Sequence, residues 1–355
     1  MDAFNSPARF AIAALTAAAL AFALISVAAA APTQAAPAVK QAGKKPADAD
    51  GKIDSERLFG AIVKVSTTAI ADARSVATLG RERQGSGIVI GDKGLVLTIG
   101  YLIVEADDIK ITDAKGRTLP ATIVGYDHAS GLGLIRSVAP LDATPVALGD
   151  SSKTAEHDPV LIASSGDDGA AFAWVVSKRL FTGSWEYQLD YAIYTSPPTM
   201  NWSGAALIDR DGKLIGIGSL IVREATDGDP KLPGNVFVPI DLLKPILADL
   251  VKTGHRPGPA RPWLGVAADE VQGRLLVTRV SPESPADQAG VQAGDIILGV
   301  AGDIVHTQAE FYKKVWGRGK AGDEIPLKVL QGVDVKEISV RSIDRTEYFR
   351  PKPTY

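Results

Sequence analysis

Residues 201–207 read Asn-Trp-Ser-Gly-Ala-Ala-Leu and place a serine on a turn of small residues just before an apolar strand. Gly204 and Ala205 leave little side-chain volume around Ser203, and the strand that follows ends at the turn Asp209–Gly212. A serine on such a turn becomes a nucleophile only when a neighbouring base accepts its proton. The identity of that base therefore decides what the loop around Ser203 can do.

The composition indicates a globular protein without a nucleic-acid, metal or cofactor motif. The chain has 355 residues, enough for about two or three domains, and a net charge of -3. This near-neutral balance provides no basic field for nucleic acid. The sequence contains no cysteine, which excludes disulfides, a thiol nucleophile and thiolate metal ligands. The histidines form no i,i+4 pair, so no metal site and no cofactor are expected.

The N-terminus has the features of an export signal. An apolar, alanine-rich run from Phe10 to Ala31 follows Arg9, and Ala28-Ala29-Ala30 offers a small-residue cleavage site. We therefore expect residues 1–31 to be a signal peptide. The alternative is an uncleaved N-terminal anchor, because the run exceeds the ~18 apolar residues that suggest a membrane span. Export without cysteines favours the periplasm, with anchoring to the inner membrane as the alternative.

Short apolar runs separated by turns dominate the body of the chain and predict a β-rich protein. Such regular spacing is typical of a sandwich or barrel. The helical spacing of apolar residues from Asp241 to Thr253 predicts a helix that closes the β domain. The expected order is a flexible linker at 32–54, the β domain at 55–253, a Pro- and Gly-rich linker at 254–262, a second unit of strands and helices at 263–342 and a C-terminal tail at 343–355.

Four stretches are weak signals alone and informative together: Gly85–Ile90, Gly94–Thr98, Val146–Ser151 and Asp209–Ile217. In this order, and ahead of the second unit, they resemble the HtrA/DegP family of exported trypsin-like serine proteases with a PDZ domain. The resemblance covers nearly everything after residue 55. It implies a mainly β fold, in which a trypsin-like double β-barrel with the active site between its barrels is followed by an α+β PDZ domain.

The resemblance also implies a catalytic triad in which Ser203 is the nucleophile, and both of its partners are replaced. In the family, the histidine base follows a Leu-Thr pair and two further residues, and Tyr101 stands at this position here. A phenol, with a reference pKa of about 10, is a poor proton acceptor at neutral pH. The run Ser130–Arg136 resembles the segment with the family's aspartate, whose position is Gly131. Loss of triad members costs roughly a million-fold in turnover in subtilisin.

The oxyanion-hole position is altered as well. The family's loop begins with a glycine whose backbone N–H helps to form the oxyanion hole, and Asn201 stands there in this sequence. The backbone donor persists, but glycine's freedom at positive φ is lost. His128, three residues before Gly131 and next to Asp127, is an alternative base. A polar turn residue is the simpler interpretation of this histidine and of His157.

The second unit keeps the PDZ pattern more fully. Trp263-Leu264-Gly265-Val266 resembles the family's carboxylate-binding loop, in which successive backbone N–H groups form a nest for a peptide C-terminus. The resemblance implies that the peptide pairs as an added strand and that a helix matching Thr307–Trp316 forms the opposite wall. Pro262 replaces a small residue before this loop, which we expect to stiffen it. The alternative is an interdomain packing module without a free ligand.

The resulting hypothesis is an exported, HtrA-like pseudoprotease. Its PDZ domain is expected to bind peptide C-termini or unfolded segments of envelope proteins, in protein quality control or scaffolding. One alternative is an active serine endopeptidase with nucleophile Ser203 and an unconventional base. Another is a chaperone-like holdase that uses the apolar surface of Trp174, Trp185 and Trp202. The resemblance adds a homotrimer as the expected assembly. Membrane contact is expected only if the N-terminal segment stays uncleaved, and no nucleic-acid partner is expected.

Overall fold

The structure is a computed structural model that describes residues 54–166 and 169–350. The signal peptide or anchor expected at residues 1–31, the linker up to residue 53 and the end of the tail, 351–355, lie outside the described residues. Within the described ranges, no helix combines the length and the apolar character needed to cross a membrane.

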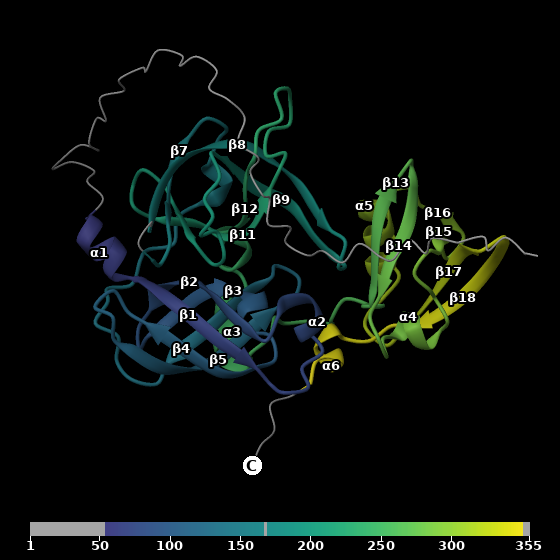
Figure 1. The fold of residues 1–355 in the computed structure, drawn as a ribbon, viewed down its shortest axis with the longest axis horizontal. Helices are drawn as coiled ribbons and strands as arrows, with labels where there is room; N and C mark the ends of the chain where they lie inside the picture. Colours follow the sequence, from purple (N-terminus) through teal and green to yellow (C-terminus); the bar gives the residue numbers. More distant parts are fainter. Residues whose placement is uncertain (1–53, 167–168, 351–355) are drawn as a thin grey trace, which may run out of the picture. The chain divides into compact units, whose positions relative to one another are not determined.

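The first barrel is built around two strands whose residues are nearly all buried. β3 (Leu95–Ile99) and β6 (Leu132–Ser137) pair antiparallel from Leu95 opposite Arg136 to Ile99 opposite Leu132. Their continuous apolar runs suit strands that contact protein on both faces. The other elements are α1 (Ser55–Gly60), β1 (Ile62–Ala69), α2 (Val76–Leu79), β2 (Glu82–Gly91), the 3-10 turn η1 (Gly100–Leu102), β4 (Ala106–Thr112) and β5 (Thr118–Asp127). The strands close in the order β1-β2-β3-β6-β5-β4 (Figure 1).

The second barrel contains a long hairpin that extends beyond the barrel wall (Figure 1). This hairpin joins β8 (Ala170–Gly183) to β9 (Tyr187–Ser196), and its tip is residues 184–186. The other elements are η2 (Ser151–Lys153), β7 (Pro159–Ala163), β10 (Ala206–Ile208), β11 (Leu214–Val222) and β12 (Gly234–Pro239). The strands close in the order β10-β11-β12-β9-β8-β7. Closure leaves neither barrel with an unpaired sheet edge.

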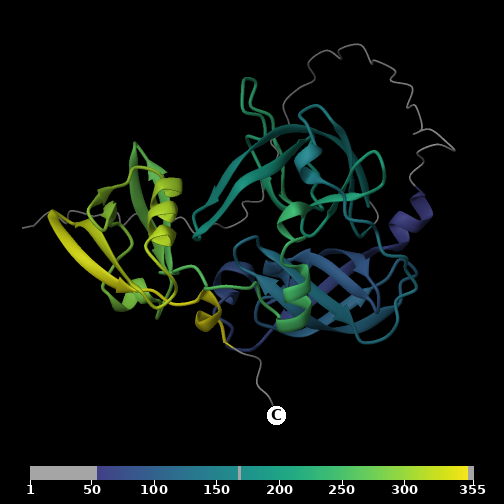
Figure 2. The same ribbon diagram turned by 180° about the vertical axis from the view of Figure 1, so that it is seen from behind.

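The helix expected from Asp241 to Thr253 is wrong in its first half. The structure has a 3-10 turn, η3 (Ile240–Leu242), and then an α-helix, α3 (Leu247–Thr253). Pro245 separates them, because it lacks an N–H and disfavours helical geometry in the preceding residue. α3 lies against the first barrel (Figure 2), where the carbonyl of Gly254 accepts a hydrogen bond from the Tyr126 N–H at 3.1 Å.

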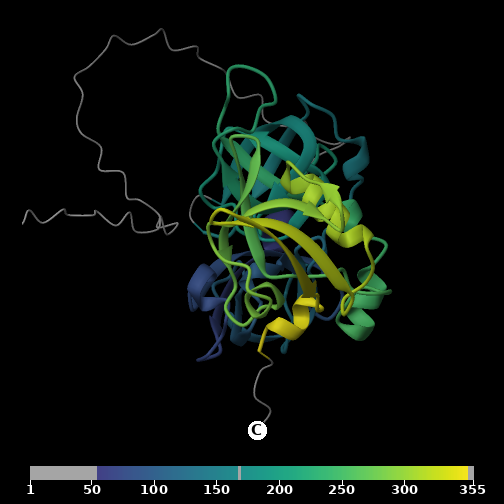
Figure 3. The ribbon, with the colours of Figure 1, turned by 90° about the vertical axis from the view of Figure 1, so that its right-hand side faces the viewer.

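The third part of the fold is a sheet with helices, as expected for a PDZ domain. The strands β13 (Val266–Val271), β14 (Arg274–Val280), β15 (Ile296–Val300), β17 (Glu324–Gln331) and β18 (Asp334–Arg341) follow one another in the sheet, and β16 (Asp303–Ile304) pairs with β15. Figure 3 shows the extended β17–β18 hairpin of this sheet. The helices are α4 (Pro285–Gln288), α5 (Gln308–Gly317) and, in the tail, α6 (Arg345–Tyr348).

Side-chain caps fix where the two PDZ helices begin. The Ser284 hydroxyl accepts from the Asp287 N–H at the start of α4, and the Thr307 hydroxyl accepts from the Glu310 N–H at the start of α5. α5 buries Phe311 and Tyr312 against the sheet. The expected fold class, a mainly β double barrel followed by an α+β PDZ domain, is confirmed.

Candidate functional site

Backbone contacts to both barrels fix the loop of Ser203. The Ser203 carbonyl accepts a hydrogen bond from the Ser86 N–H of β2 at 2.8 Å, and the Gly204 N–H donates to the Gly218 carbonyl of β11 at 2.9 Å. Gly204 has a φ of 71°, and a β-carbon there would lie 2.1 Å from the Ser86 carbonyl oxygen. Glycine is therefore required next to Ser203. The half-buried Ser203 side chain thus has a defined position between the barrels.

Tyr101 lies directly against the candidate nucleophile. It belongs to η1, immediately after β3, and its hydroxyl oxygen is 3.0 Å from Ser203 Oγ and 3.0 Å from the Ser219 carbonyl oxygen. The Ser219 carbonyl can only accept a hydrogen bond, and the Tyr101 hydroxyl has a single proton to donate. Tyr101 can therefore donate to Ser219 while it accepts a hydrogen bond from the Ser203 hydroxyl. The position of the expected base is therefore filled by a group that contacts Ser203 but already carries its proton.

The electrostatic environment keeps Tyr101 protonated. Burial raises the pKa of Tyr101 to about 12, against a lowering effect of its hydrogen bond with Ser203. Burial has this effect because it disfavours the charged phenolate. A general base needs a pKa near the working pH, so Tyr101 is poorly suited to activate Ser203 at neutral pH.

Gly131, at the position of the family's aspartate, is covered by an aromatic ring. Its φ is 76°, and a β-carbon there would come within 3.2 Å of the Tyr187 hydroxyl oxygen. That hydroxyl donates to the Ser130 carbonyl at 2.5 Å. The Gly131 carbonyl in turn accepts a hydrogen bond at 2.7 Å from the N–H of Gly100, the residue directly before Tyr101. The space for an orienting carboxylate is thus occupied by Tyr187.

The oxyanion-hole position is also engaged within its own loop. The Asn201 N–H donates to the Thr199 hydroxyl at 3.3 Å. Thr199 is held by the side chain of Asn235, which accepts from the Thr199 N–H at 2.8 Å and donates to its carbonyl at 3.1 Å. An oxyanion hole needs backbone donors that are aimed at the developing negative charge. Here the Asn201 donor is directed at a neutral hydroxyl.

The alternative base, His128, has a structural environment of its own. Its ring lies 4.2 Å from that of Tyr126 and stacks at 5.6 Å on that of Phe349. Burial lowers the pKa of His128 to about 3. Asp127 does not orient this ring, because its carboxylate accepts two hydrogen bonds from the Arg256 guanidinium at 2.7 and 2.9 Å.

His157 does not substitute for the missing base. His157 is exposed in a turn before β7 and has a φ of 70°. Over the described ranges, no group of His, Asp and Glu side chains is arranged to hold a metal ion.

In the PDZ domain, three successive backbone N–H groups converge on one carboxylate. The N–H groups of Leu264, Gly265 and Val266 donate to the side chain of Glu186 at 3.0, 2.6 and 2.9 Å. Trp263 is not part of this nest, since its N–H and carbonyl pair with Ile343. Gly265 has a φ of 88°, and a β-carbon there would clash with Ser284 at 2.2 Å.

Comparisons with known proteins agree with this architecture. A family model described as a trypsin-like peptidase domain matches residues 85–217, and a PDZ domain model matches residues 262–341. The "Probable periplasmic serine endoprotease DegP-like" of Hahella chejuensis is 28% identical over 271 residues, which are 72% of this chain and 56% of that protein. The "Periplasmic serine endoprotease DegP" of Escherichia coli K12 is 28% identical over 276 residues, with the same two shares. This chain belongs to the HtrA/DegP-like proteins.

A solved structure shares the fold. The "HtrA-type protease AlgW with decapeptide" aligns with a TM-score of 0.50 and 19% identity, over 84% of this chain and 98% of that chain. At this identity, the likeness concerns the fold alone. This HtrA/DegP-like chain spans about half the length of the curated relatives that it matches.

The structure brings some of the sequence-predicted site residues of this HtrA/DegP-like protein together. Ser203 and Tyr101 are in contact, whereas the positions of Gly131 and Asn201 are closed by their own neighbours. Sequence reasoning missed Glu186, which fills the nest of the PDZ loop. A single glutamate in a polar turn carries no motif, so no sequence signal could have identified it.

Proposed function

We propose that this HtrA/DegP-like protein is catalytically inactive and acts by binding polypeptide segments. The observation that carries this proposal is the contact of Tyr101 with Ser203 Oγ at 3.0 Å. A neutral, buried phenol at the position of the base neither removes the serine proton nor returns it to a leaving group at neutral pH. The covered glycine at position 131 supports the same conclusion.

We further propose that the PDZ domain binds peptide C-termini or unfolded segments of exported proteins. The loop Leu264–Val266 presents three N–H groups to one point, which is the geometry that receives a terminal carboxylate. The nest accepts a carboxylate in the present structure, which supports this chemistry. The AlgW structure is described as one with a decapeptide, which is consistent with such a role in this protein.

The cellular setting of this proposal is the periplasm. The curated relatives are named periplasmic, and the N-terminal sequence has the pattern of an export signal. A role in protein quality control or scaffolding, a homotrimeric assembly and attachment to the inner membrane through an uncleaved N-terminus are parts of the hypothesis. The mass of the mature protein and its elution on size-exclusion chromatography test the last two.

A protease assay tests the inactive barrel. Purified protein is incubated with unfolded casein, beside Ser203→Ala and beside the Escherichia coli DegP protein as a positive control for the assay. We expect casein turnover by the wild-type protein to be no greater than that by Ser203→Ala, because both lack an effective base. We also expect no labelling of Ser203 by a fluorophosphonate probe. Turnover that disappears in Ser203→Ala would show that the site is active.

The same assay decides the alternative of an active endopeptidase. The Tyr101–Ser203 contact is the observation in favour of it, since a deprotonated phenol could accept the serine proton. That mechanism predicts probe labelling that rises as pH approaches about 12, the pKa of Tyr101, and that is lost in Tyr101→Phe.

The holdase alternative rests on a small apolar patch of β8. Phe172 is 66% exposed and Trp174 is 49% exposed, and both lie on the outer side of the strand. Trp185 and Trp202 are half-buried and contribute less. Suppression of casein aggregation by the wild-type protein, but not by a Phe172→Ser, Trp174→Ser double variant, would favour this function over recognition by the PDZ domain.

A further inference from the structure

The carboxylate-binding loop of the PDZ domain is already occupied by a carboxylate of the same chain. Glu186 lies at the tip of the β8–β9 hairpin, and its Oε1 atom accepts hydrogen bonds from Gly265 and Val266 at 2.6 and 2.9 Å. Oε2 accepts from Leu264 at 3.0 Å. Glu186 is only 7% exposed, so water does not provide an alternative set of donors. These contacts reproduce what the nest would offer to a peptide C-terminus.

The hairpin tip also occupies the groove beside the loop. The Ala268 N–H of β13 donates to the Ser184 carbonyl at 3.3 Å, which is a contact that an added strand would make. From the opposite wall, the Tyr312 hydroxyl of α5 donates to the Gly183 carbonyl at 2.7 Å and accepts from the Glu186 N–H at 3.1 Å. The tip is therefore bound by both walls of the groove.

The main-chain carbonyl of Ala268 in β13 is also already hydrogen-bonded within the protein. The Gln308 side chain, at the start of α5, donates to the Ala268 carbonyl at 2.5 Å. Both backbone groups of Ala268 are thus engaged, one by the hairpin and one by α5. An incoming peptide would have to displace Ser184 and Gln308 to pair with this strand.

The hairpin is built to hold this conformation. Glu186 has a φ of 56°, a region that non-glycine residues seldom adopt. Trp185 stacks on Tyr187 with ring centres 5.8 Å apart, and it covers Gly183 so closely that a β-carbon there would lie 2.6 Å from its ring. This packing directs the Glu186 side chain toward the PDZ loop without help from an external ligand.

We infer that Glu186 is an intramolecular ligand of the PDZ carboxylate-binding loop, so that the resting groove is closed to external C-termini until the β8–β9 hairpin withdraws. This inference rests on the proposed peptide-binding function and describes its regulation. A ligand tethered in the same chain acts at a high effective concentration. The apparent affinity for an external peptide is then lowered in proportion to the fraction of molecules whose groove is open.

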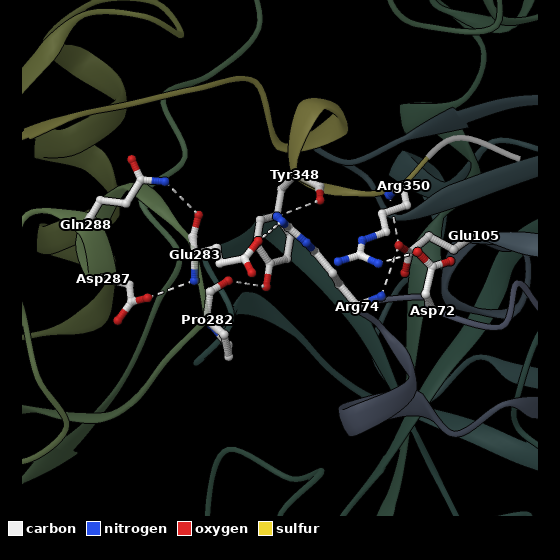
Figure 4. A network of polar contacts seen from close by, with 9 residues as sticks. All are labelled: Asp72, Arg74, Glu105, Pro282, Glu283, Asp287, Gln288, Tyr348 and Arg350. Carbon is white, nitrogen blue, oxygen red and sulfur yellow. Dashed lines mark hydrogen bonds and ion pairs between the residues drawn. The ribbon is translucent and has the colours of Figure 1, made fainter. Parts of the chain in front are cut away.

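A second contact keeps the PDZ domain attached when the groove opens. Figure 4 shows Arg74 of the first barrel between Glu283 of the PDZ domain and Tyr348 of α6. Arg74 forms an ion pair with Glu283 and donates to the Tyr348 carbonyl at 3.2 Å. Further along the tail, the Arg350 N–H donates to the Glu105 carboxylate at 2.9 Å. Release of the hairpin therefore frees the groove without freeing the domain.

Binding of a defined peptide pool to the full-length protein tests the inference. The probe is a pool of fluorescein-labelled decapeptides with randomised last four positions and a free C-terminal carboxylate, and the matched pool ends in amides. We expect Glu186→Ala to bind the carboxylate pool about tenfold or more tightly than the wild-type protein does, because removal of the internal ligand raises the open fraction. Glu283→Ala is the matched control, since it removes a carboxylate from the contact with Arg74 but not from the groove, and it should bind like the wild-type protein.

The outcomes separate the regulation from the function. If the wild-type protein and Glu186→Ala bind the carboxylate pool equally and both prefer it to the amide pool, the internal ligand is refuted and the proposed function stands. If neither prefers the carboxylate pool, both ideas fail. Amide exchange gives a second readout, because Gly265 and Val266 should exchange faster in Glu186→Ala and in Tyr312→Phe, which keeps the ring and removes the two hydroxyl bonds to the hairpin. Unchanged exchange in Tyr312→Phe would contradict the inference even if Glu186→Ala does not fold.

Discussion

The hydroxyl of Tyr101 satisfies the serine without activating it. It provides Ser203 Oγ with a partner at 3.0 Å, so that the serine is held as it would be beside a base. The carbonyl of Ser219 fixes the phenol proton on the other side. Under the proposed inactivity, Tyr101 preserves the loop while removing its chemistry.

The glycine at position 131 is structurally required, and this gives a stability prediction. Gly131→Asp places a side chain at a φ of 76° and against the Tyr187 hydroxyl. We expect a loss of about 3 kcal/mol in the free energy of unfolding, from backbone strain together with a crowded carboxylate. Urea unfolding measures this loss. We also expect no gain in casein turnover, because Tyr101 remains.

Gly116→Asp is the matched control for this substitution. Gly116 has a φ of 80°, but a β-carbon there meets no other heavy atom within 4 Å. It therefore isolates the cost of positive φ, which should be about 1 kcal/mol. Equal losses for the two variants would mean that Tyr187 does not crowd position 131.

At the scale of elements, the β8–β9 hairpin joins two sites that the sequence separates. Glu186 fills the nest of the PDZ loop, and its neighbour Tyr187 covers Gly131 in the first barrel. Glu186 belongs to the turn of the hairpin and Tyr187 is the first residue of β9, so two adjacent residues serve two different partners. Withdrawal of the hairpin tip would disturb both contacts together. The PDZ groove and the neighbourhood of Gly131 are therefore linked through one short segment.

The pKa of Glu186 predicts how docking of the hairpin depends on pH. Burial raises this pKa to about 6 from an ordinary value of 4.5, although the three backbone donors and the charge of Arg345 lower it. The docked form thus binds the proton more tightly than the free form does. The pKa difference therefore stabilises the docked hairpin by up to about 2 kcal/mol. This stabilisation is fully present below about pH 4.5 and is lost as the pH rises through about 6. The Tyr312 hydroxyl, which also faces Glu186, stays protonated in this range because burial raises its pKa.

Amide exchange measures this pH dependence. Protection factors at Gly265 and Val266, corrected for intrinsic exchange, should fall between pH 4.5 and pH 7.5 in the wild-type protein. Glu186→Gln cannot ionise and should show no such fall. A protection factor that rises with pH in the wild-type protein would mean that the three donors outweigh burial.

The sequence predicts the elements that follow from local patterns and misses those that depend on distant contacts. The helix expected at Thr307–Trp316 appears as α5 (Gln308–Gly317), with Thr307 as its N-cap. The helix predicted from Asp241 is interrupted at Pro245. The apolar spacing predicts a continuous helix, although a proline inside it is a local signal against one. β8 is hard to recognise from its sequence, because its outward-facing Phe172 and Trp174 are apolar and hide the alternation of a half-buried strand.

The candidate site also contains features that local motifs predict and features that depend on distant contacts. The proximity of Tyr101 to Ser203 could be predicted, because both positions follow from motifs. The contact of Glu186 with the PDZ loop could not, since it joins residues 78 to 80 positions apart and depends on how the hairpin is aimed. The covering of Gly131 by Tyr187 is equally non-local.

At the scale of the whole molecule, two separate contacts hold the PDZ domain to the barrels. One is the hairpin tip in the groove, and the other is the cluster of Arg74, Glu283 and Tyr348. Ser75, the residue after Arg74, is connected to the candidate site. The buried Arg83 donates to the Ser75 hydroxyl at 2.7 Å and to the Tyr101 carbonyl at 3.1 Å. The hairpin contact is connected to the candidate site as well, through Tyr187, which covers Gly131.

A pair of variants tests whether these contacts act as two independent anchors. When one anchor is cut, the other still holds the domain near its position at a high effective concentration. We therefore expect Glu186→Ala and Arg74→Ala each to leave the radius of gyration in solution scattering close to that of the wild-type protein. The double variant should expand clearly, because, among the described residues, mainly the Arg256–Asp127 contact and the tail contacts of Phe349 and Arg350 then remain between the PDZ domain and the barrels. Lys115→Ala, which removes an ion pair with Asp142 within the first barrel, is the control for a lost surface charge. If either single variant expands as much as the double variant does, one contact alone holds the PDZ domain and the other only accompanies it.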